Sequence, residues 1–187
     1  QHNPLPAVLD AVDKQHLLIV DGLSDRYEGL DRERDWHGTP YAFGSIPNFG
    51  GHSTLGANAG VWLKRFAAWR DKPGSKLRGI AWMPEASGID PAAFALFTAL
   101  AWEPVPRDEA AGFKAYADSR YGGADGHAEA AWHVLGETAY AMPSDGDSEP
   151  QDGLFGARPA QDVATAATRS PKAMRYDAGH FDQAIFE

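Results

Sequence analysis

One acidic residue stands where a sheet-based enzyme would carry its chemistry. Glu85 follows a short apolar segment, residues 79–83, that is predicted to be a buried strand. Pro84 restricts the backbone before it, and the small residues at 86–88 form an open turn before the next predicted helix. In α/β barrels, the carboxyl ends of the strands carry the catalytic groups. Glu85 is therefore a candidate catalytic residue, although a strand-end glutamate could equally cap the following helix.

Aromatic residues and glycines gather at the same predicted edge. An aromatic-rich strand is predicted at 40–46, and a glycine-rich loop follows it at 47–52. Aromatic faces beside a carboxylate suit a pocket for a sugar. The residues predicted to share this edge are Phe43, Gly44, Phe49, Gly50, Gly51 and Trp82.

Other kinds of site find no support in the sequence. The glycine-containing segment 51–56 lacks the Lys and Ser/Thr that a phosphate loop needs. The acidic segment 145–150 begins like a calcium loop, but Pro150 replaces its turn glycine. His127 and His133 are six positions apart, which puts them on different faces of a helix. No nucleotide or metal site is therefore predicted.

Composition narrows the classes of partner. The chain has 187 residues, with 17 Lys and Arg against 26 Asp and Glu, a formal charge of −9. Because no basic stripe is present to neutralise phosphates, nucleic acid and anionic membranes are not expected partners. No apolar run approaches the roughly 20 residues that span a bilayer. The absence of Cys leaves the redox compartment open. The chain starts at Gln1 without a basic leader segment, so no signal peptide is predicted. A processed or excerpted chain would look the same.

The first half of the chain alternates predicted helices and strands. This order is compatible with parallel strands joined by crossover helices, which is an α/β architecture. The predicted elements are a helix at 5–13, a strand at 16–21, a polar loop at 22–39, a strand at 40–46, a helix at 61–70, a strand at 79–83, and a helix that begins at Asp90-Pro91.

From Pro104 onward the pattern changes to helices alone. Residues 108–120 and 126–142 are both predicted to be amphipathic helices, with no strand between them. A long loop is expected at 143–159 and the opening of a further helix at 181–186. We therefore expect a domain boundary near residue 105.

An ordered set of motifs resembles one enzyme family. Asn48-Phe49-Gly50-Gly51-His52, then Met83-Pro84-Glu85, then the helical segment 97–102 occur in the order found in the α-N-acetylglucosaminidases of glycoside hydrolase family 89. The resemblance covers most of the chain, because further matching segments lie at 17–21, 40–51, 82–86, 100–102, 104–106 and 120–122.

The resemblance implies a fold, an activity and site residues. It implies retaining, exo-acting hydrolysis of terminal α-linked N-acetylglucosamine, on a (β/α)8 TIM-type barrel followed by an all-α domain. By matching position, Glu85 would be the nucleophile, and a second carboxyl group about 5 to 5.5 Å away would be the acid/base. No metal or organic cofactor is implied. The substrate-binding residues would be Phe43, Gly44, Asn48, Phe49, Gly50 and Trp82.

The chain also departs from the family. Trp82 stands for a Met of the nucleophile segment and Ala86 for its Gly. A barrel needs about 250 residues, whereas only about three strand units precede residue 105. We therefore expect the C-terminal part of the barrel at 1–105 and the beginning of the helical domain at 106–187.

The short extent has consequences for activity. The family's acid/base lies on an earlier barrel strand with no counterpart here, so the chain alone is expected to be inactive without the remainder of its parent enzyme. A secreted or periplasmic parent is compatible with this interpretation, and the substrate would be a glycan that ends in N-acetylglucosamine. The alternative is a non-catalytic carbohydrate-binding or scaffold fragment, which would keep the aromatic rings for stacking and make no use of the Glu85 charge.

Overall fold

A three-stranded parallel sheet organises the first half of the chain. In this computed structural model, the described residues are 4–47, 55–85, 90–102, 108–141 and 178–186. The strands β1 (Ile19–Asp21), β2 (Tyr41–Ser45) and β3 (Leu77–Trp82) pair in the order β1-β2-β3, all parallel. This confirms the predicted α/β architecture and puts the carboxyl ends of all three strands at one edge.

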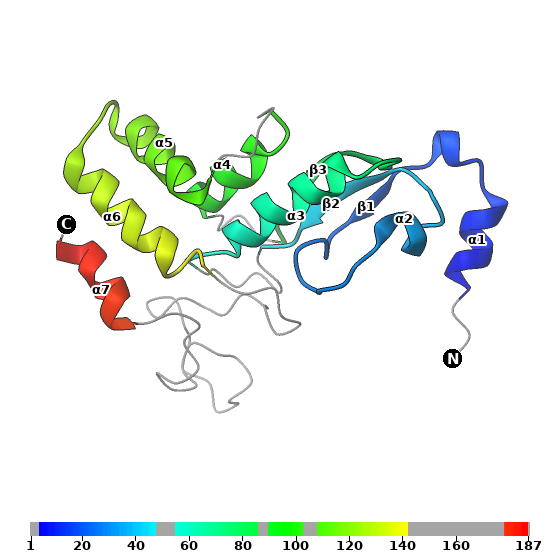
Figure 1. The fold of residues 1–187 in the computed structure, drawn as a ribbon, viewed down its shortest axis with the longest axis horizontal. Coiled ribbons are helices and arrows are strands. Elements are labelled where there is room, and N and C mark those ends of the chain that lie inside the picture. Colours follow the sequence, from blue (N-terminus) through cyan, green and yellow to red (C-terminus); the bar gives the residue numbers. More distant parts are fainter. Residues whose placement is uncertain (1–3, 48–54, 86–89, 103–107, 142–177, 187) are drawn as a thin grey trace.

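The helices around the sheet follow the predicted order. α3 (Ala59–Asp71) joins β2 to β3, and α4 (Pro91–Ala99) follows β3 (Figure 1). Asp90 accepts hydrogen bonds from the backbone N–H groups of Ala92 and Ala93, so it is the predicted N-cap of α4. The N-terminal helix is α1 (Leu5–Ala11).

Two parts of the N-terminal region differ from the sequence prediction. The strand predicted at 16–21 is shorter, because Asp13 caps a 3-10 turn, η1 (Lys14–His16), by accepting a hydrogen bond from Gln15 N. The polar loop at 22–39 contains an unpredicted single-turn helix, α2 (Arg32–Asp35), which Asp31 caps. Four residues are too few for hydrophobic periodicity to indicate a helix.

The second half of the chain is helical in the described residues. α5 (Glu109–Tyr121) and α6 (Gly126–Glu137) pack side by side, and α7 (Ala178–Phe186) packs on α6 (Figure 1). α6 ends earlier than predicted, since the chain turns at Thr138. The loop predicted at 143–159 lies outside the described residues. No helix in the described ranges is both long enough and apolar enough to cross a membrane.

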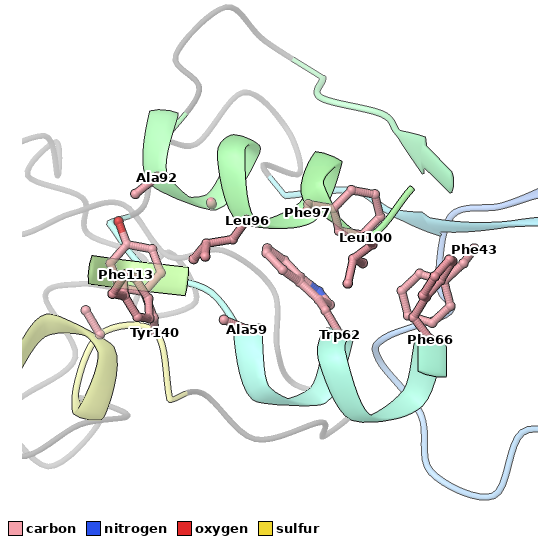
Figure 2. Packing of buried hydrophobic residues seen from close by; sticks show 12 residues of the cluster. Phe43, Ala59, Trp62, Phe66, Ala92, Leu96, Phe97, Leu100, Phe113 and Tyr140 are labelled. Carbon is pink, nitrogen blue, oxygen red and sulfur yellow. The ribbon is translucent and has the colours of Figure 1, made fainter. Parts of the chain in front are cut away.

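One hydrophobic core joins the two halves. Its members come from β2, α3 and α4 on one side and from α5 and the segment after α6 on the other, as Figure 2 shows. The largest buried side chains of this core are Phe43, Trp62, Phe66, Phe97, Phe113 and Tyr140.

Backbone hydrogen bonds also connect the halves. Ala57 N donates to Ala139 O at 3.1 Å, and Ala59 N donates to Tyr140 O at 3.0 Å. Asn58 and Ala141 form an antiparallel bridge. The start of α3 is therefore paired with the segment that follows α6.

The sheet is closely packed at Gly44 on β2. A Cβ atom at this position would overlap the carbonyl oxygen of Asp21 on β1 and would come within 2.8 Å of Met83 Cε. A backbone carbonyl cannot swing aside as the end of a flexible side chain can. Gly44 therefore allows β1, β2 and the end of β3 to approach each other.

We expect Gly44→Ala to lower the free energy of unfolding by about 1–3 kcal/mol, the usual cost of forcing an extra methyl group into a packed site. Gly79→Ala is the matched control, because position 79 on the neighbouring strand has no atom within 4 Å of an added Cβ. Urea unfolding of both variants measures the difference. Equal stabilities would contradict the close approach at Gly44.

A buried carboxylate lies where α5 meets α3. Glu109 is the first residue of α5, and its Oε2 faces Gly60 in the first turn of α3. Its Oε1 is buried with no hydrogen-bond partner among the described residues. Burial raises the pKa of Glu109 from its ordinary 4.5 to about 7.

This raised pKa predicts a pH-dependent loss of stability. Below pH 4.5 Glu109 is protonated in both states; between pH 4.5 and about 7 the unfolded state loses the proton first, so the folded state is progressively destabilised. We expect the free energy of unfolding of Glu109→Gln to rise relative to the unsubstituted protein across this interval and to level off above it. Urea unfolding at a series of pH values measures this. The opposite slope would show that the N-terminal dipoles of α3 and α5 outweigh burial.

Candidate active site

Glu85 lies just beyond the carboxyl edge of the sheet. β3 ends at Trp82, and Met83 N still donates to Ser45 O at 3.0 Å, so the pairing with β2 continues one residue past the strand. Pro84 and Glu85 follow, and Glu85 is exposed. The parallel sheet thus delivers the candidate residue to the edge at which β1 and β2 also end.

The side chain of Met83 crosses two glycines at this edge. Its Cε lies where a side chain at Gly44 or at Gly22 would be, 2.8 and 3.1 Å from the respective Cβ positions. Gly44 belongs to β2, and Gly22 directly follows β1. The Met83 side chain, at the start of the segment that leads to Glu85, therefore packs against the end of β2 and the residue that follows β1.

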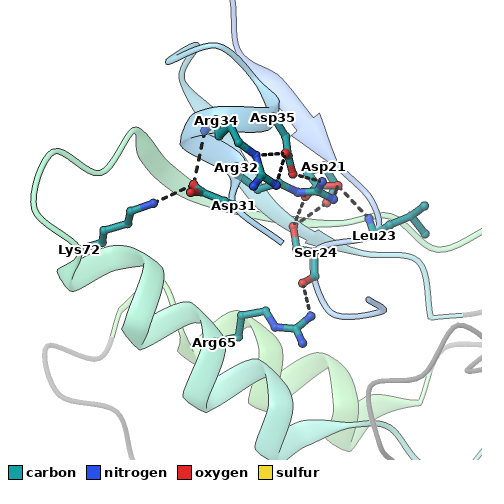
Figure 3. A network of polar contacts seen from close by, with 9 residues as sticks. All are labelled: Asp21, Leu23, Ser24, Asp31, Arg32, Arg34, Asp35, Arg65 and Lys72. Atoms are coloured by element: carbon teal, nitrogen blue, oxygen red, sulfur yellow. Dashed lines mark hydrogen bonds and ion pairs between the residues drawn. The ribbon is translucent and has the colours of Figure 1, made fainter. Parts of the chain in front are cut away.

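A buried ion pair fixes the end of β1. Arg32 Nε and Nη2 donate to the two carboxylate oxygens of Asp21 at 2.6 and 3.0 Å, and both side chains are at most 10% exposed. Ser24 Oγ donates to Asp21 Oδ2 at 2.8 Å and accepts a hydrogen bond from Gly44 N at 3.1 Å. Figure 3 shows this network, in which Arg65 of α3 also donates to Ser24 O. The Asp21 carboxylate is thus occupied by structural partners.

A second buried carboxylate, Asp25, holds both ends of the segment between β2 and α3. Its Oδ2 accepts hydrogen bonds from Ser45 Oγ at 2.9 Å and from Trp62 Nε1 at 2.8 Å. Its backbone oxygen accepts one from Asn58 Nδ2 at 3.2 Å. Burial raises the pKa of Asp25. Ser45 ends β2 and Asn58 precedes α3, so the β1–α2 loop fixes the points between which the chain runs through 46–57.

A third carboxylate, Asp90, joins three segments. Besides capping α4, it accepts hydrogen bonds on Oδ2 from Gly56 N at 3.1 Å and from Tyr140 Oη at 2.7 Å. Asp90 lies five positions after Glu85. It therefore connects the start of α4, the segment that precedes α3, and the segment that follows α6.

The described sugar-contact candidates, Phe43, Trp82 and Gly44, do not lie together. The ring of Phe43 is fully buried and packs edge-on against Phe66 and Trp69, with centroids 5.7 and 5.4 Å apart. The ring of Trp82 packs against Trp62 and Phe97. Both rings therefore lie on the helix-covered face of the sheet.

The other expected contacts are placed differently. Gly44 lies near the carboxyl end of the central strand β2, beneath Met83 and on the opposite face of β2 from Phe43. Asn48, Phe49 and Gly50 lie outside the described residues. The structure thus brings Gly44 together with the segment that leads to Glu85 and separates both from the rings of Phe43 and Trp82.

Sequence reasoning did not single out Asp21 or Asp25 and recognised Asp90 only as a helix cap. The signal available for Asp21 was a carboxylate at the end of a predicted strand, the same signal that drew attention to Glu85. What separates the two is burial: Asp21 is 5% exposed and paired with Arg32, whereas Glu85 is exposed.

A metal-binding cluster or a cavity would be the other kind of candidate site among the described residues. No group of three or more His, Asp or Glu side chains suited to a metal occurs in the part of the chain that the structure describes. A largely apolar cavity of about 190 Å³ lies between α3, α4 and α5. Its lining includes no residue from the strand ends, so it is separate from the edge that carries Glu85.

Comparison with known proteins gives a consistent match along the chain. The family model "Alpha-N-acetylglucosaminidase (NAGLU) tim-barrel domain" matches residues 1–104, and the model "Alpha-N-acetylglucosaminidase (NAGLU) C-terminal domain" matches residues 113–187. The alpha-N-acetylglucosaminidase of Homo sapiens is 33% identical over 150 residues, which are 75% of this chain and 20% of that protein.

Solved structures share the fold. A family 89 glycoside hydrolase from Clostridium perfringens in complex with PUGNAc has a TM-score of 0.77 at 23% identity, covering 96% of this chain and 20% of that one. A Clostridium perfringens structure with two glutamate-to-glutamine substitutions, in complex with its substrate GlcNAc-alpha-1,4-galactose, has a TM-score of 0.72 at 23% identity, covering 90% and 19%.

This chain therefore spans about a fifth of the length of the relatives it matches. Both family models, the human relative and the shared fold agree on one assignment. The chain belongs to the alpha-N-acetylglucosaminidase family.

Proposed function

We propose that this chain carries the nucleophile of a retaining exo-glycosidase that removes terminal α-linked N-acetylglucosamine from glycans. The observation that carries the proposal is the exposed Glu85 at the carboxyl edge of a parallel sheet, in a chain that belongs to the alpha-N-acetylglucosaminidase family. The bound substrate of the Clostridium perfringens relative, GlcNAc-alpha-1,4-galactose, supports the sugar and its linkage.

In the proposed reaction, the Glu85 carboxylate attacks the anomeric carbon from the face opposite the leaving oxygen. A second carboxyl group donates its proton to that oxygen as the glycosidic bond breaks, which leaves a covalent glycosyl ester on Glu85. The same second group then takes a proton from water, and the water oxygen displaces Glu85 from the anomeric carbon. Two inversions give a product of retained configuration.

Glu85 suits the nucleophile's part in this scheme because its surroundings differ from those of its neighbours. A nucleophile must reach the substrate, and Asp21 and Asp25, at the ends of the same sheet, are buried among hydrogen-bond donors. We propose that the acid/base belongs to a part of the relatives' length that this chain does not span.

We also propose a division of the chain near residue 105. The two family models support it, since one covers 1–104 and the other 113–187. Residues 1–105 would then be the C-terminal part of the catalytic barrel and 106–187 the start of the helical domain.

The substrate contacts are proposed on the same basis. Asn48, Phe49 and Gly50 would shape the pocket from the segment between β2 and α3, with Gly44 at its base. Phe43 and Trp82, whose rings pack against α3 and α4, would support the strands beneath the pocket.

We expect Glu85→Gln in the full-length enzyme to lower kcat by at least about a thousandfold, because removal of a nucleophile leaves only binding and the remaining catalytic groups. Binding of N-acetylglucosamine should persist, since the amide keeps the size and shape of the side chain and one carbonyl oxygen as an acceptor. Release of p-nitrophenol from the α-linked N-acetylglucosamine glycoside measures turnover.

Glu137→Gln on α6 is a suitable control, because it removes an exposed glutamate far along the chain from the β3 edge. It should leave turnover unchanged. Near-normal turnover of Glu85→Gln would remove Glu85 from the mechanism. The 187-residue chain alone should be inactive, and activity in a sample free of other chains would refute the proposed external acid/base.

A further inference from the structure

We propose that Tyr140, from the segment after α6, is a positioning residue for the catalytic edge, and that it acts through the carboxylate of Asp90. The proposal rests on the proposed function, because it takes Glu85 as the nucleophile. It adds a residue of the helical half to the parts of the chain on which turnover depends.

Asp90 is the first described residue after Glu85 and lies five positions beyond it. The chain leaves the sheet after Met83, and Asp90 caps the start of α4. Oδ1 of Asp90 accepts from Ala92 N at 2.9 Å and from Ala93 N at 3.1 Å. A change in the orientation of this carboxylate would move the point to which the chain returns after Glu85.

The other oxygen of Asp90 reaches the segment before α3. Oδ2 accepts from Gly56 N at 3.1 Å. The next residues are held by the helical half, since Ala57 N and Ala59 N donate to the carbonyl oxygens of Ala139 and Tyr140. One carboxylate thus joins the start of α4, five positions after Glu85, to the residue Gly56 that precedes α3.

Tyr140 is built to hold that carboxylate still. Its side chain is fully buried, and its ring packs on Phe113 with centroids 4.9 Å apart and on Trp132 at 6.2 Å. Figure 2 shows the hydroxyl pointing toward Ala92 at the start of α4. Because packing fixes the ring, it also fixes the position of the hydroxyl oxygen, which donates to Asp90 Oδ2 at 2.7 Å. Burial raises the pKa of Tyr140, so the phenol keeps its proton.

The contact therefore couples the two halves at a specific atom. The shared hydrophobic core supplies general cohesion, but a packing contact has little directional preference. A short hydrogen bond to a carboxylate is directional, and it is stronger than a neutral one. Among the described residues, the other donors to Asp90 are backbone N–H groups, so Tyr140 supplies the side-chain donor in that part of the chain, and a substitution can remove it.

Tyr140→Phe in the full-length enzyme tests this directly, because it removes one oxygen and keeps the ring. We expect kcat/KM for the p-nitrophenyl glycoside to fall about tenfold, the scale of a lost hydrogen bond to a charged group. We also expect the inhibition constant of 2-acetamido-1,2-dideoxynojirimycin, a ligand of a relative's solved structure, to rise by a similar factor. Tyr121→Phe, which alters an exposed tyrosine at the end of α5, should change neither value.

The pathway through Asp90 has its own test. Asp90→Asn keeps a side chain that caps helices as well as Asp does, and we expect it to lower kcat/KM at least as much as Tyr140→Phe. If Tyr140 acts through Asp90, the double variant should lose no more than Asp90→Asn alone. Losses that multiply independently would overturn the proposed pathway.

A merely structural role gives a different result. In that case Tyr140→Phe would lower the melting temperature while kcat/KM and the inhibition constant stayed within about twofold of the unsubstituted values. This outcome, with Glu85→Gln inactive, would overturn the inference and leave the proposed function standing. Turnover by Glu85→Gln would instead refute the proposed function itself.

Discussion

The buried pair of Asp21 and Arg32 is the contact on which the strand ends beside Glu85 depend. Both charged groups are buried there, and two nitrogens of Arg32 donate to the two carboxylate oxygens of Asp21. Loss of one partner from such a pair strands the remaining charge, which generally costs about 3–5 kcal/mol. Ser24 links this pair to β2, because its hydroxyl donates to Asp21 and accepts a hydrogen bond from Gly44 N. The nearby Asp25 accepts hydrogen bonds from Ser45 at the end of β2 and from Trp62 on α3.

The two faces of the sheet have different tasks. On one face, the rings of Phe43 and Trp82 interlock with those of α3 and α4, and this packing supplies rigidity. On the other face, Gly22 and Gly44 leave room for the Met83 side chain, so the chain that leads to Glu85 lies close to the backbones of its neighbours.

Most of the regular elements could be predicted from the sequence, because their apolar residues recur with helical or strand spacing. The second and third strands and α3 to α5 follow this rule. The cap at Asp90 was predictable for a different reason, an acceptor side chain followed by Pro91. α2 could not be predicted, since its single turn depends on the cap at Asp31 and on the ion pair of Arg32 with Asp21.

The candidate site was predictable only in part. Glu85 stood out because it follows an apolar strand, and the family resemblance supported it. Phe43 and Gly44 are adjacent in a strand and must face opposite sides, so alternation alone separates the ring of Phe43 from the open face. The contact between Asp90 and Tyr140 spans 50 positions, and no local pattern reports such a pairing.

The pairing of residues 57–59 with 139–141 has a further consequence for how such a chain can evolve. Two of its contacts are hydrogen bonds between main-chain atoms, so they do not depend on which side chains occupy these positions. Substitutions at these positions can therefore change the side chains without removing the main-chain hydrogen bonds that align the two halves.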